Sequence, residues 1–480
     1  MRRPMNILWI QTDEQRTDSI GAYGNRAVRT PVLDRLAQEG TVFKNHHVQS
    51  PVCVPSRVCE LTGLYPHQTG IVDNLVHYNH GRWPDGIGTF PERFAAAGYA
   101  TANFGKYHTP HHPTWLENWH FEWFAKEASF FSLGKGFDEA EHEIIHHGNT
   151  LPRYIVSGRY PHVKGGRTPQ SHLVDIVSEW LSGFSSVRRP FFVRASFLAP
   201  HTPVLAPEPF YGMYDPADMD WDAPSEEVLA SRPAYESSSV IRAWRGRHTD
   251  EQYRRMRCTY YGLVSHVDEQ VGRLLGVLEE TGERENTLIV YTSDHGVLMG
   301  EYGQFQKGMF YDLVTRVPCI MAGPGVPRGR VVEHLTEQVD LGPTLLELAG
   351  LPVPEETEGR DLLGPEPPRE DVIGEIGGRM MWDMNAPMWT DMPERHRHSR
   401  IRRSWIRTQR WSLDFTSEIE GRPTAAREEQ DGKLIDLEAD PLAHVNLFGD
   451  PGCARIVEEL QARFRERTSE RRRPLQIVDP

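Results

Sequence analysis

The sequence predicts an α/β fold with a large, mainly parallel central sheet that is covered by helices on both faces. Short apolar runs with strand character alternate with longer amphipathic stretches along most of the chain, and this alternation is typical of parallel sheets. The polar residues that could carry chemistry follow the apolar runs or lie in loops, and ligands of such sheets bind beyond the carboxyl ends of the strands. Both observations indicate a large α/β unit with a site at that edge of its sheet.

The individual elements follow from apolar spacing and from glycines that end helices. The run from Asn6 to Thr12 is short and apolar, which indicates a buried strand. Gly40 and Gly98 each follow an amphipathic stretch and end a predicted helix. In chain order, the predicted elements are a strand at Asn6 to Thr12, helices at Pro31 to Glu39, Phe90 to Ala97 and Leu173 to Phe184, a strand at Phe191 to Leu198, a helix at Asp250 to Glu280, and strands at Thr287 to Thr292 and Val317 to Ala322.

The amino-acid composition changes near residue 370, where predicted loops rich in Arg, Met and Trp begin. Beyond these loops, Ile401 to Asp414 has the pattern of a β-hairpin, and Ile456 to Arg467 has that of a charged terminal helix. We therefore predict a main catalytic α/β domain over residues 1–370 and a C-terminal α+β subdomain with a small antiparallel sheet over residues 371–480.

Charge and cysteine usage exclude several classes of protein. The 53 Lys and Arg residues against 67 Asp and Glu residues give a net charge of −14. No basic block could follow a phosphate backbone, so we expect no nucleic-acid partner. The five cysteines are odd in number and lack paired spacing, which argues against a disulfide framework. The apolar run Ile7 to Ile10 is too short for a signal sequence, and no run reaches the roughly 20 apolar residues of a membrane span. We expect a cytoplasmic protein with no membrane partner.

The segment Cys53-Val54-Pro55-Ser56-Arg57, followed by Leu61-Thr62-Gly63, is the most informative motif in the chain. It resembles the motif in which type I sulfatases, members of the alkaline phosphatase superfamily, carry a cysteine that is oxidised to formylglycine. The resemblance runs from Asn6 to the region of Asn446, and it implies a large α/β sandwich with a smaller C-terminal α+β part. It also implies that a formylglycine-generating enzyme acts on Cys53 during maturation. Two alternatives remain open: a buried structural thiol and a reactive thiolate whose pKa Arg57 helps to lower.

Formylglycine at residue 53 would offer chemistry that no natural side chain has. The aldehyde hydrates to a geminal diol, so one hydroxyl can attack sulfur while the other remains to expel the product. Covalent catalysis divides one hard displacement into two easier steps, and the sulfated hemiacetal expected here collapses by elimination. The resemblance therefore implies hydrolysis of a sulfate monoester through residue 53.

Two segments far apart in the sequence could bind a divalent metal ion. Asp13 and Glu14 follow the first predicted strand, and Asp294 and His295 follow the strand that ends near Ser293. Carboxylates at two strand ends can converge on one hard cation. The resemblance implies calcium, with residue 53 beside the ion. The nitrogen of His295, where many sulfatases have Asn, makes manganese an alternative, and magnesium is a third.

Glu14 is a second departure from the family pattern, because a second Asp is usual at its position. Its extra methylene could place it behind the direct ligands. Without the resemblance, Asp13 would be interpreted as a helix cap and Asp294-His295 as a turn.

Cations and proton carriers are expected around the metal. Gly105-Lys106-Tyr107-His108 resembles a segment of the sulfatases, His201 follows a predicted strand, and Lys307 lies shortly after the metal segment. The resemblance implies that Lys106 and Lys307 neutralise sulfate oxygens and that Arg57 stabilises the alkoxide of residue 53. His201 would protonate the departing alcohol and His108 would remove a proton from the second hydroxyl, although these two roles could be exchanged. A lone Lys or His is otherwise more often a solvated or structural residue.

Three functions from different classes remain. The motif at Cys53 favours a sulfatase acting on a small sugar or aryl sulfate. Phosphonate monoester and phosphodiester hydrolases of the same superfamily form the second interpretation, and a non-catalytic protein that binds sulfated ligands is the third. The His- and aromatic-rich stretches at 108–131 and 380–389 could stack on a substrate or pack loops. The apolar stretch 380–392 could form a homo-oligomer interface if it is exposed.

Overall fold

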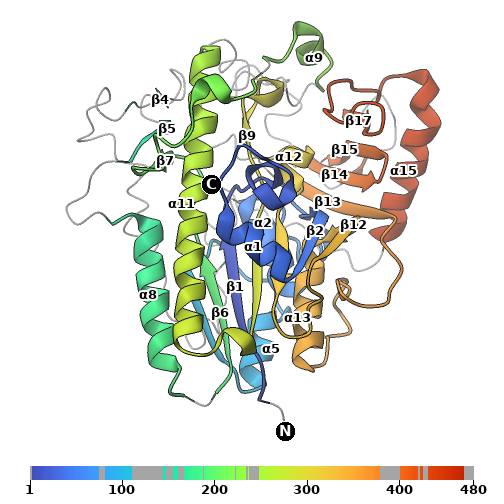
Figure 1. The fold of residues 1–480 in the computed structure, drawn as a ribbon. Helices are drawn as coiled ribbons and strands as arrows, with labels where there is room; N and C mark the ends of the chain where they lie inside the picture. The colour runs from blue at the N-terminus through green and yellow to red at the C-terminus, as the bar shows by residue number, and fades with distance from the viewer. Residues whose placement is uncertain are drawn as a thin grey trace.

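A central sheet organises the structure, which is a computed structural model (Figure 1). The model describes residues 3–74, 82–110, 143, 145–146, 155–160, 167–187, 189–221, 223–233, 236, 248–378, 401–419, 422–424 and 431–469. Across this sheet the strands are β12 (Arg330–Glu337), β2 (Thr41–His47), β11 (Cys319–Ala322), β8 (Thr287–Ser293), β1 (Asn6–Thr12), β6 (Phe191–Ser196) and β3 (Ala100–Gly105). The predicted α/β class is confirmed.

Strand β1 lies between β8 and β6 and is parallel to both. In this register Thr12 lies opposite Ser293, and Gln11 lies opposite Ser196. The carboxyl ends of the three strands therefore meet at one edge, as predicted. Strand β11 is the exception, because it runs antiparallel to both β8 and β2.

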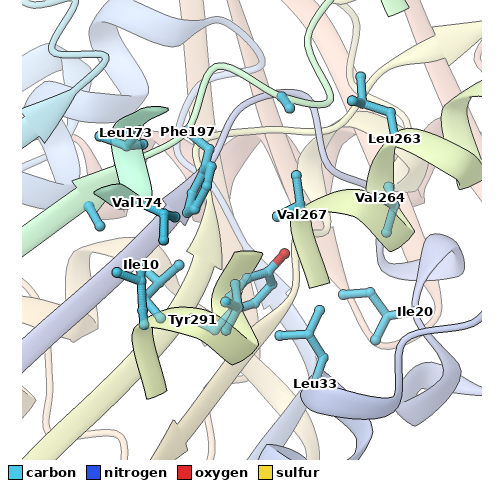
Figure 2. Close-up of a cluster of buried hydrophobic side chains, with 14 of the residues drawn as sticks. Ile10, Ile20, Leu33, Leu173, Val174, Phe197, Leu263, Val264, Val267 and Tyr291 are labelled. Carbon is cyan, nitrogen blue, oxygen red and sulfur yellow. The ribbon is translucent and has the colours of Figure 1, made fainter. Parts of the chain in front are cut away.

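Helices cover both faces of the sheet, and alternate strand residues face each layer. Leu8 and Ile10 of β1 pack with α1 (Pro31–Glu39), α8 (Pro169–Phe184) and α11 (Asp250–Glu280). Figure 2 shows the side chains of Ile10, Val174, Val267 and Tyr291 converging in this layer. Ile7 and Trp9 pack on the other face with α5 (Phe90–Ala96) and α13 (Leu341–Ala349). The period of two along each strand thus decides which layer a residue joins.

The predicted helices agree with the structure except at their ends. Helix α8 begins at Pro169, four residues before the predicted start, because Thr168 accepts a hydrogen bond from the backbone N–H of Ser171 and the proline occupies the first turn. Helix α11 has the predicted bounds and begins with a capping box formed by Thr249 and Gln252. No helix in the described part of the chain has both the length and the apolarity to cross a membrane.

The C-terminal region forms an antiparallel sheet that α15 (Ala454–Arg467) covers (Figure 1). Its strands are β13 (Asp371–Gly378), β14 (Ile401–Thr408), β15 (Trp411–Ile419), β16 (Arg422–Pro423) and β17 (Gly432–Asp436). The predicted hairpin is confirmed as β14 and β15. Ile406, Leu413 and Phe464 share a buried cluster with Cys59 of α2 (Cys53–Thr62), so this sheet packs against the helix that carries the Cys53 motif.

Smaller elements complete the described chain. They are α3 (Pro66–Thr69), β4 (Ile145–His146), β5 (Ile155–Arg159), β7 (Val204–Ala206), α9 (Glu226–Ala230), β9 (Leu298–Met299), β10 (Phe305–Gln306), α12 (Asp312–Thr315) and the short turn η8 (Gln338–Asp340). The stretches at 111–131 and 380–392, which we interpret as substrate-facing or interface segments, lie outside the described residues.

Candidate active site

Helix α2 carries the Cys53 motif and is buried along its whole length. Cys53 is its first residue, so the positive end of the helix dipole lies at the thiol. The helix ends at Gly63, whose φ of 70° favours glycine. The hydroxyl of Ser56 donates to the backbone carbonyl of Asp294 at 2.5 Å, and the backbone N–H of Val54 donates to Asn74 Oδ1 at 2.9 Å. The first bond ties the start of α2 to the carboxyl end of β8, and the second ties it to the loop at Asn74.

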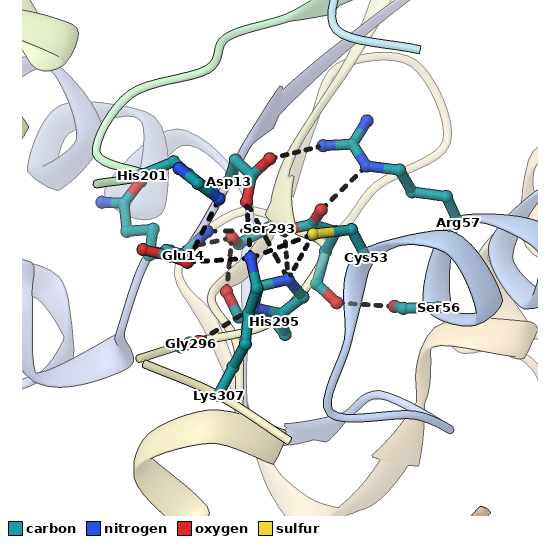
Figure 3. A network of polar contacts seen from close by, with 12 residues as sticks. Asp13, Glu14, Cys53, Ser56, Arg57, His201, Ser293, His295, Gly296 and Lys307 are labelled. Atoms are coloured by element: carbon teal, nitrogen blue, oxygen red, sulfur yellow. Dashed lines mark hydrogen bonds and ion pairs between the residues drawn. The ribbon is translucent and has the colours of Figure 1, made fainter. Parts of the chain in front are cut away.

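Nitrogen atoms surround the sulfur of Cys53 (Figure 3). Lys307 Nζ lies 3.0 Å from Sγ, His295 Nε2 lies 3.1 Å away, and Lys106 Nζ lies 3.5 Å away. Burial and the charge of Asp294 nevertheless raise the pKa of the thiol, against the opposing effect of Lys307 and Arg57. A neutral thiol is a poor nucleophile, so these surroundings do not favour a reactive thiolate at residue 53.

A group of potential metal ligands lies around the sulfur. Asp13, Cys53, Asp294 and His295 are all buried, and each offers a ligand atom within 4.8 Å of the others. Asp13 Oδ1 is buried and accepts no hydrogen bond, which leaves a carboxylate oxygen free for a cation. Two carboxylates and an imidazole form a donor set for a divalent ion. The residues therefore fit the metal that we predict from the sequence.

Glu14 has a different environment from the other predicted ligands. It groups with Asp13 and His201 as a second set of potential ligands, not with Cys53 and Asp294. Its backbone has φ 62°, and one carboxylate oxygen accepts hydrogen bonds from the N–H and hydroxyl of Thr202 at 3.1 and 3.0 Å. The other oxygen forms an ion pair with Lys307 Nζ at 2.8 Å. Glu14 is thus tied to Thr202 and Lys307, and Asp13 is the residue that its ligand set shares with the first one.

Arg57 points at Asp13, as Figure 3 shows, and also contacts Asp294. Its Nε donates to Asp294 Oδ2 at 2.8 Å, and Nη2 lies 3.5 Å from Asp13 Oδ2. Nη1 donates to the carbonyl of Lys106 and to Ser196 Oγ, both at 3.1 Å. Burial alone would raise the pKa of Asp294, but Arg57, followed by His295 and the two lysines, holds it well below its usual value. The guanidinium therefore favours the ionised form of Asp294 and lies beside the carboxylate of Asp13.

The two lysines differ in their electrostatics. Burial lowers the pKa of Lys106 to about 7, assisted by the charges of Lys307 and Arg194, although its Nζ bonds to Asp13. For Lys307, burial also favours the neutral amine, but Cys53, Glu14 and Asp294 outweigh it and raise the pKa. Lys307 is therefore a fixed cation, whereas Lys106 can exchange a proton near neutral pH.

His201 lies at the margin of this group. His201 Nδ1 lies 2.5 Å from the carbonyl of Thr202, which assigns the proton to Nδ1. Its Nε2 then faces Glu14 Oε1 at 3.3 Å with a lone pair. Burial and the charges of Lys307 and Lys106 lower the pKa of His201 well below its usual value, so the ring must gain a proton before it can act as an acid. His108 is partly buried, has φ 49°, and is not among the ligand groups found in the described residues.

Several supporting residues were not predicted from the sequence. Ser196 ends β6 and accepts a hydrogen bond from Arg57, and Thr202 holds Glu14. Gln306 Nε2 donates to Thr202 Oγ1 at 2.6 Å. The position of Ser196 after a buried run is a signal that could have identified it. A lone Thr or Gln in a loop carries no such signal.

Known proteins that are similar to this chain include sulfatases. A family model described as "Sulfatase" matches residues 5–351, and one described as "N-sulphoglucosamine sulphohydrolase, C-terminal" matches residues 300–470. The chain is 27% identical to the N-acetylglucosamine-6-O-sulfatase of Bacteroides thetaiotaomicron, over 97% of this chain and 86% of that protein. It is 31% identical to the iduronate 2-sulfatase of Mus musculus, over 73% and 69% of the two chains. The phosphonate monoester hydrolase of Agrobacterium radiobacter shares the fold, with a TM-score of 0.75 at 24% identity over 97% and 96% of the chains.

Proposed function

The chain belongs to the sulfatase family of the alkaline phosphatase superfamily, and on that premise we propose that it hydrolyses a sulfate monoester of a sugar or an aryl alcohol. One observation carries the proposal. The sulfur of Cys53 lies within 3.5 Å of two lysine nitrogens and one imidazole nitrogen, at the buried end of a helix. The two lysines therefore offer hydrogen-bond donors to the oxygens of an anionic ester. The His295 ring donates through Nδ1 to the Gly296 carbonyl, so its Nε2 faces residue 53 with a lone pair.

Asp13, Asp294 and His295 would hold one divalent ion, with residue 53 beside it. The carboxylates favour calcium or magnesium, and the nitrogen of His295 makes manganese an alternative. Formylglycine at residue 53 would supply a hydrated aldehyde whose hydroxyl is the nucleophile, and the ion would supply a Lewis acid. Glu14 is assigned to orienting Lys307 and His201, from its contacts with both.

The remaining side chains bind charge and move protons. Lys307 stays cationic and neutralises ester oxygens, because its pKa is raised. Lys106 contributes charge and, with a pKa of about 7, can also exchange a proton. Arg57 holds Asp13 and Asp294 in place and favours the ionised form of Asp294. His201 is our candidate for protonating the leaving alcohol and His108 for taking the proton from residue 53. His201 needs to gain that proton first, and the exchange of the two roles remains an alternative.

Hydrolysis of a phosphonate monoester or a phosphodiester is the second candidate. Arg57, Lys106 and Lys307 place three cationic side chains within one site, and such a concentration of charge would also suit a phosphoryl ester. A protein that only binds sulfated ligands is not favoured, because the nucleophile position and the potential metal ligands are all present.

Peptide mass spectrometry tests the proposal first, on protein made in a host that can install formylglycine. Residue 53 should show the mass of the aldehyde, and a Cys53→Ala variant supplies the matched inactive control. Competing aryl sulfate, sugar sulfate and phosphonate monoester substrates should then show the highest kcat/KM for a sulfate ester. An unmodified thiol in the competent host would refute the formylglycine mechanism. A higher kcat/KM for the phosphonate would instead favour the phosphonate or phosphodiester hydrolase.

Four further predictions from the sequence stay as proposals. We propose a cytoplasmic location, maturation by a formylglycine-generating enzyme, a division into domains 1–370 and 371–480, and a homo-oligomer formed through the apolar stretch 380–392. Size-exclusion chromatography with light scattering would test the oligomer. Limited proteolysis would test the domain division.

A further inference from the structure

Four polar side chains lie buried between helix α2 and the central sheet, below the active site. They are Gln11 of β1, Glu60 of α2, Arg194 of β6 and Gln338 of η8, and each has 0% exposure. Gln11 Nε2 and Gln338 Nε2 donate to the same carboxylate oxygen of Glu60 at 2.6 and 2.8 Å. Arg194 donates to the other Glu60 oxygen and, through Nε, to Gln11 Oε1 at 2.6 Å. We call these residues the Glu60 network.

Each member of the Glu60 network that lies on a strand is next to an active-site residue on the same face. Side chains alternate along a strand, so Gln11 shares its face with Asp13, and Arg194 shares its face with Ser196. Glu60 lies one helical turn beyond Arg57, so it lies on the same side of α2. The site therefore lies at the carboxyl ends of the strands. The Glu60 network lies on the same face of the sheet, two residues further from those ends.

The network also joins α2 to a third part of the fold. Gln338 Oε1 contacts His46 Nε2 of β2 at 2.9 Å and Thr292 Oγ1 of β8 at 3.3 Å. Thr292 lies two residues before Asp294 on the same strand face. Glu60 is thus the point on α2 at which hydrogen bonds from β1, β6 and η8 converge.

A contribution to folding stability does not by itself explain why Glu60 and Arg194 are charged residues. A buried ion pair recovers little more than its desolvation penalty, and well-packed apolar residues of similar size often stabilise a protein equally well. Burial raises the pKa of Glu60 and lowers that of Arg194 to about 10, even though each charge opposes the shift of the other. Directional hydrogen bonds supply what apolar packing does not, which is a fixed depth and rotation of α2 against the strands.

We propose that Glu60 and Arg194, supported by Gln11 and Gln338, are positioning residues that set the placement of residue 53 and Arg57 relative to Asp13 and Asp294. This inference rests on the proposed function, because it assigns Cys53 and Arg57 to the reaction. Glu60 and Arg194 do not contact the sulfur of Cys53 or the metal-ligand group; they act through α2 and the two strands.

The test separates positioning from folding with a paired substitution. In the E60L/R194L double variant both charges are replaced, so no charge of the pair is left buried alone. We expect the double variant to fold with a lower unfolding temperature than the parent, because the buried amides of Gln11 and Gln338 lose their partners. We also expect kcat, normalised to the formylglycine content of each sample, to fall roughly 10- to 100-fold, since small misplacements of reacting groups have effects of this size.

A second readout does not depend on activity. Hydrogen–deuterium exchange of peptides covering 53–62 should be faster in E60L/R194L than in the parent. E60Q keeps the side-chain shape and much of the hydrogen bonding, so its kcat should exceed that of the double variant. The matched control is R403L/D414L, which removes a buried arginine–carboxylate pair of the C-terminal sheet and should keep the parental kcat.

The outcomes distinguish the two proposals. If E60L/R194L shows the parental normalised kcat and the parental exchange of 53–62, the positioning role is refuted. If the parent itself hydrolyses no sulfate ester, the proposed function fails, and the exchange measurement still decides whether the Glu60 network fixes α2.

Discussion

Replacing Arg57 with Ala should destabilise the fold by about 3 kcal/mol or more, because breaking a buried ion pair leaves an uncompensated charge worth about 3–5 kcal/mol. The side chain is fully buried and contacts Asp294 at 2.8 Å and Asp13 at 3.5 Å. It also donates to the Lys106 carbonyl and to Ser196 Oγ, and those acceptors would lose a donor. Lys106 remains beside Asp13, which places the expected loss toward the lower end of the range.

The pH dependence of this loss supplies a second check. The folded pKa of Asp294 is depressed, and Arg57 is the leading cause of that depression. A depressed carboxyl pKa contributes stability that is present above the unfolded value of about 4 and disappears as the pH falls further. The difference between parent and Arg57→Ala should therefore be largest near neutral pH and shrink in acid.

Urea denaturation at pH 7 and at pH 4, with a chelator present, measures both effects. The comparison is made in a Cys53→Ala background, so that neither modification of residue 53 nor a bound metal contributes to the difference. A loss below about 1 kcal/mol at pH 7, the range of exposed pairs, would refute the reasoning. So would a loss that grows in acid.

Three further predictions concern the metal, a buried histidine and a glycine. Chelation should lower the melting temperature and abolish sulfatase activity, and Ca²⁺, Mn²⁺ and Mg²⁺ are then compared for recovery. An Asp13→Asn variant should show no metal-dependent rise in melting temperature. A rise equal to that of the parent would contradict the proposed metal site. Burial lowers the pKa of His46 to about 4, so between pH 6.5 and pH 4 the unfolded chain binds a proton that the folded chain does not. The free energy of unfolding should therefore fall by up to about 3 kcal/mol over this range because of this residue. In denaturation curves His46→Gln should reduce this pH dependence, and an unchanged pH dependence would refute the lowered pKa of His46. Gly105 has φ 88°, and a Cβ there would meet the Ser196 carbonyl at 2.0 Å. Gly105→Ala should therefore destabilise the fold by more than about 1 kcal/mol, and it should reduce activity by displacing the adjacent Lys106. Gly98→Ala is the control for backbone strain, because Gly98 has a similar φ but open space around it.

The residues that follow strands could be located from sequence because parallel strands end at one edge. Asp13, Asp294 and His295 converge as predicted, and Lys106 follows β3 directly. The direction of β11 could not be foreseen, since an apolar run looks the same in either direction. Strands β2, β3 and β12 were not predicted, because polar residues interrupt all three. Lys106 was therefore singled out by its resemblance to a family segment and not by a predicted strand.

The contacts of individual side chains were harder to predict than their positions in the fold. Arg57 was expected to serve residue 53 directly, but its guanidinium contacts the two aspartates. The turn of Glu14 toward Thr202 depends on a left-handed backbone at that residue, which no local pattern indicates. Gln11 and Arg194 resembled incidental polar residues within apolar runs, because the partner that explains them, Glu60, is far away in sequence.

The complete burial of α2 has a kinetic consequence for the life of the protein. Cys53 is 1% exposed, and the C-terminal sheet packs against the far end of its helix. Under the proposed function, a modifying enzyme would have to reach this thiol before α2 is buried between the central strands and the C-terminal sheet. The fraction of active molecules would then be set by a race between modification and folding during synthesis. Substitutions that slow the docking of β14 and β15 would lengthen the interval in which the motif is accessible, so a less stable C-terminal region could yield a more fully modified enzyme.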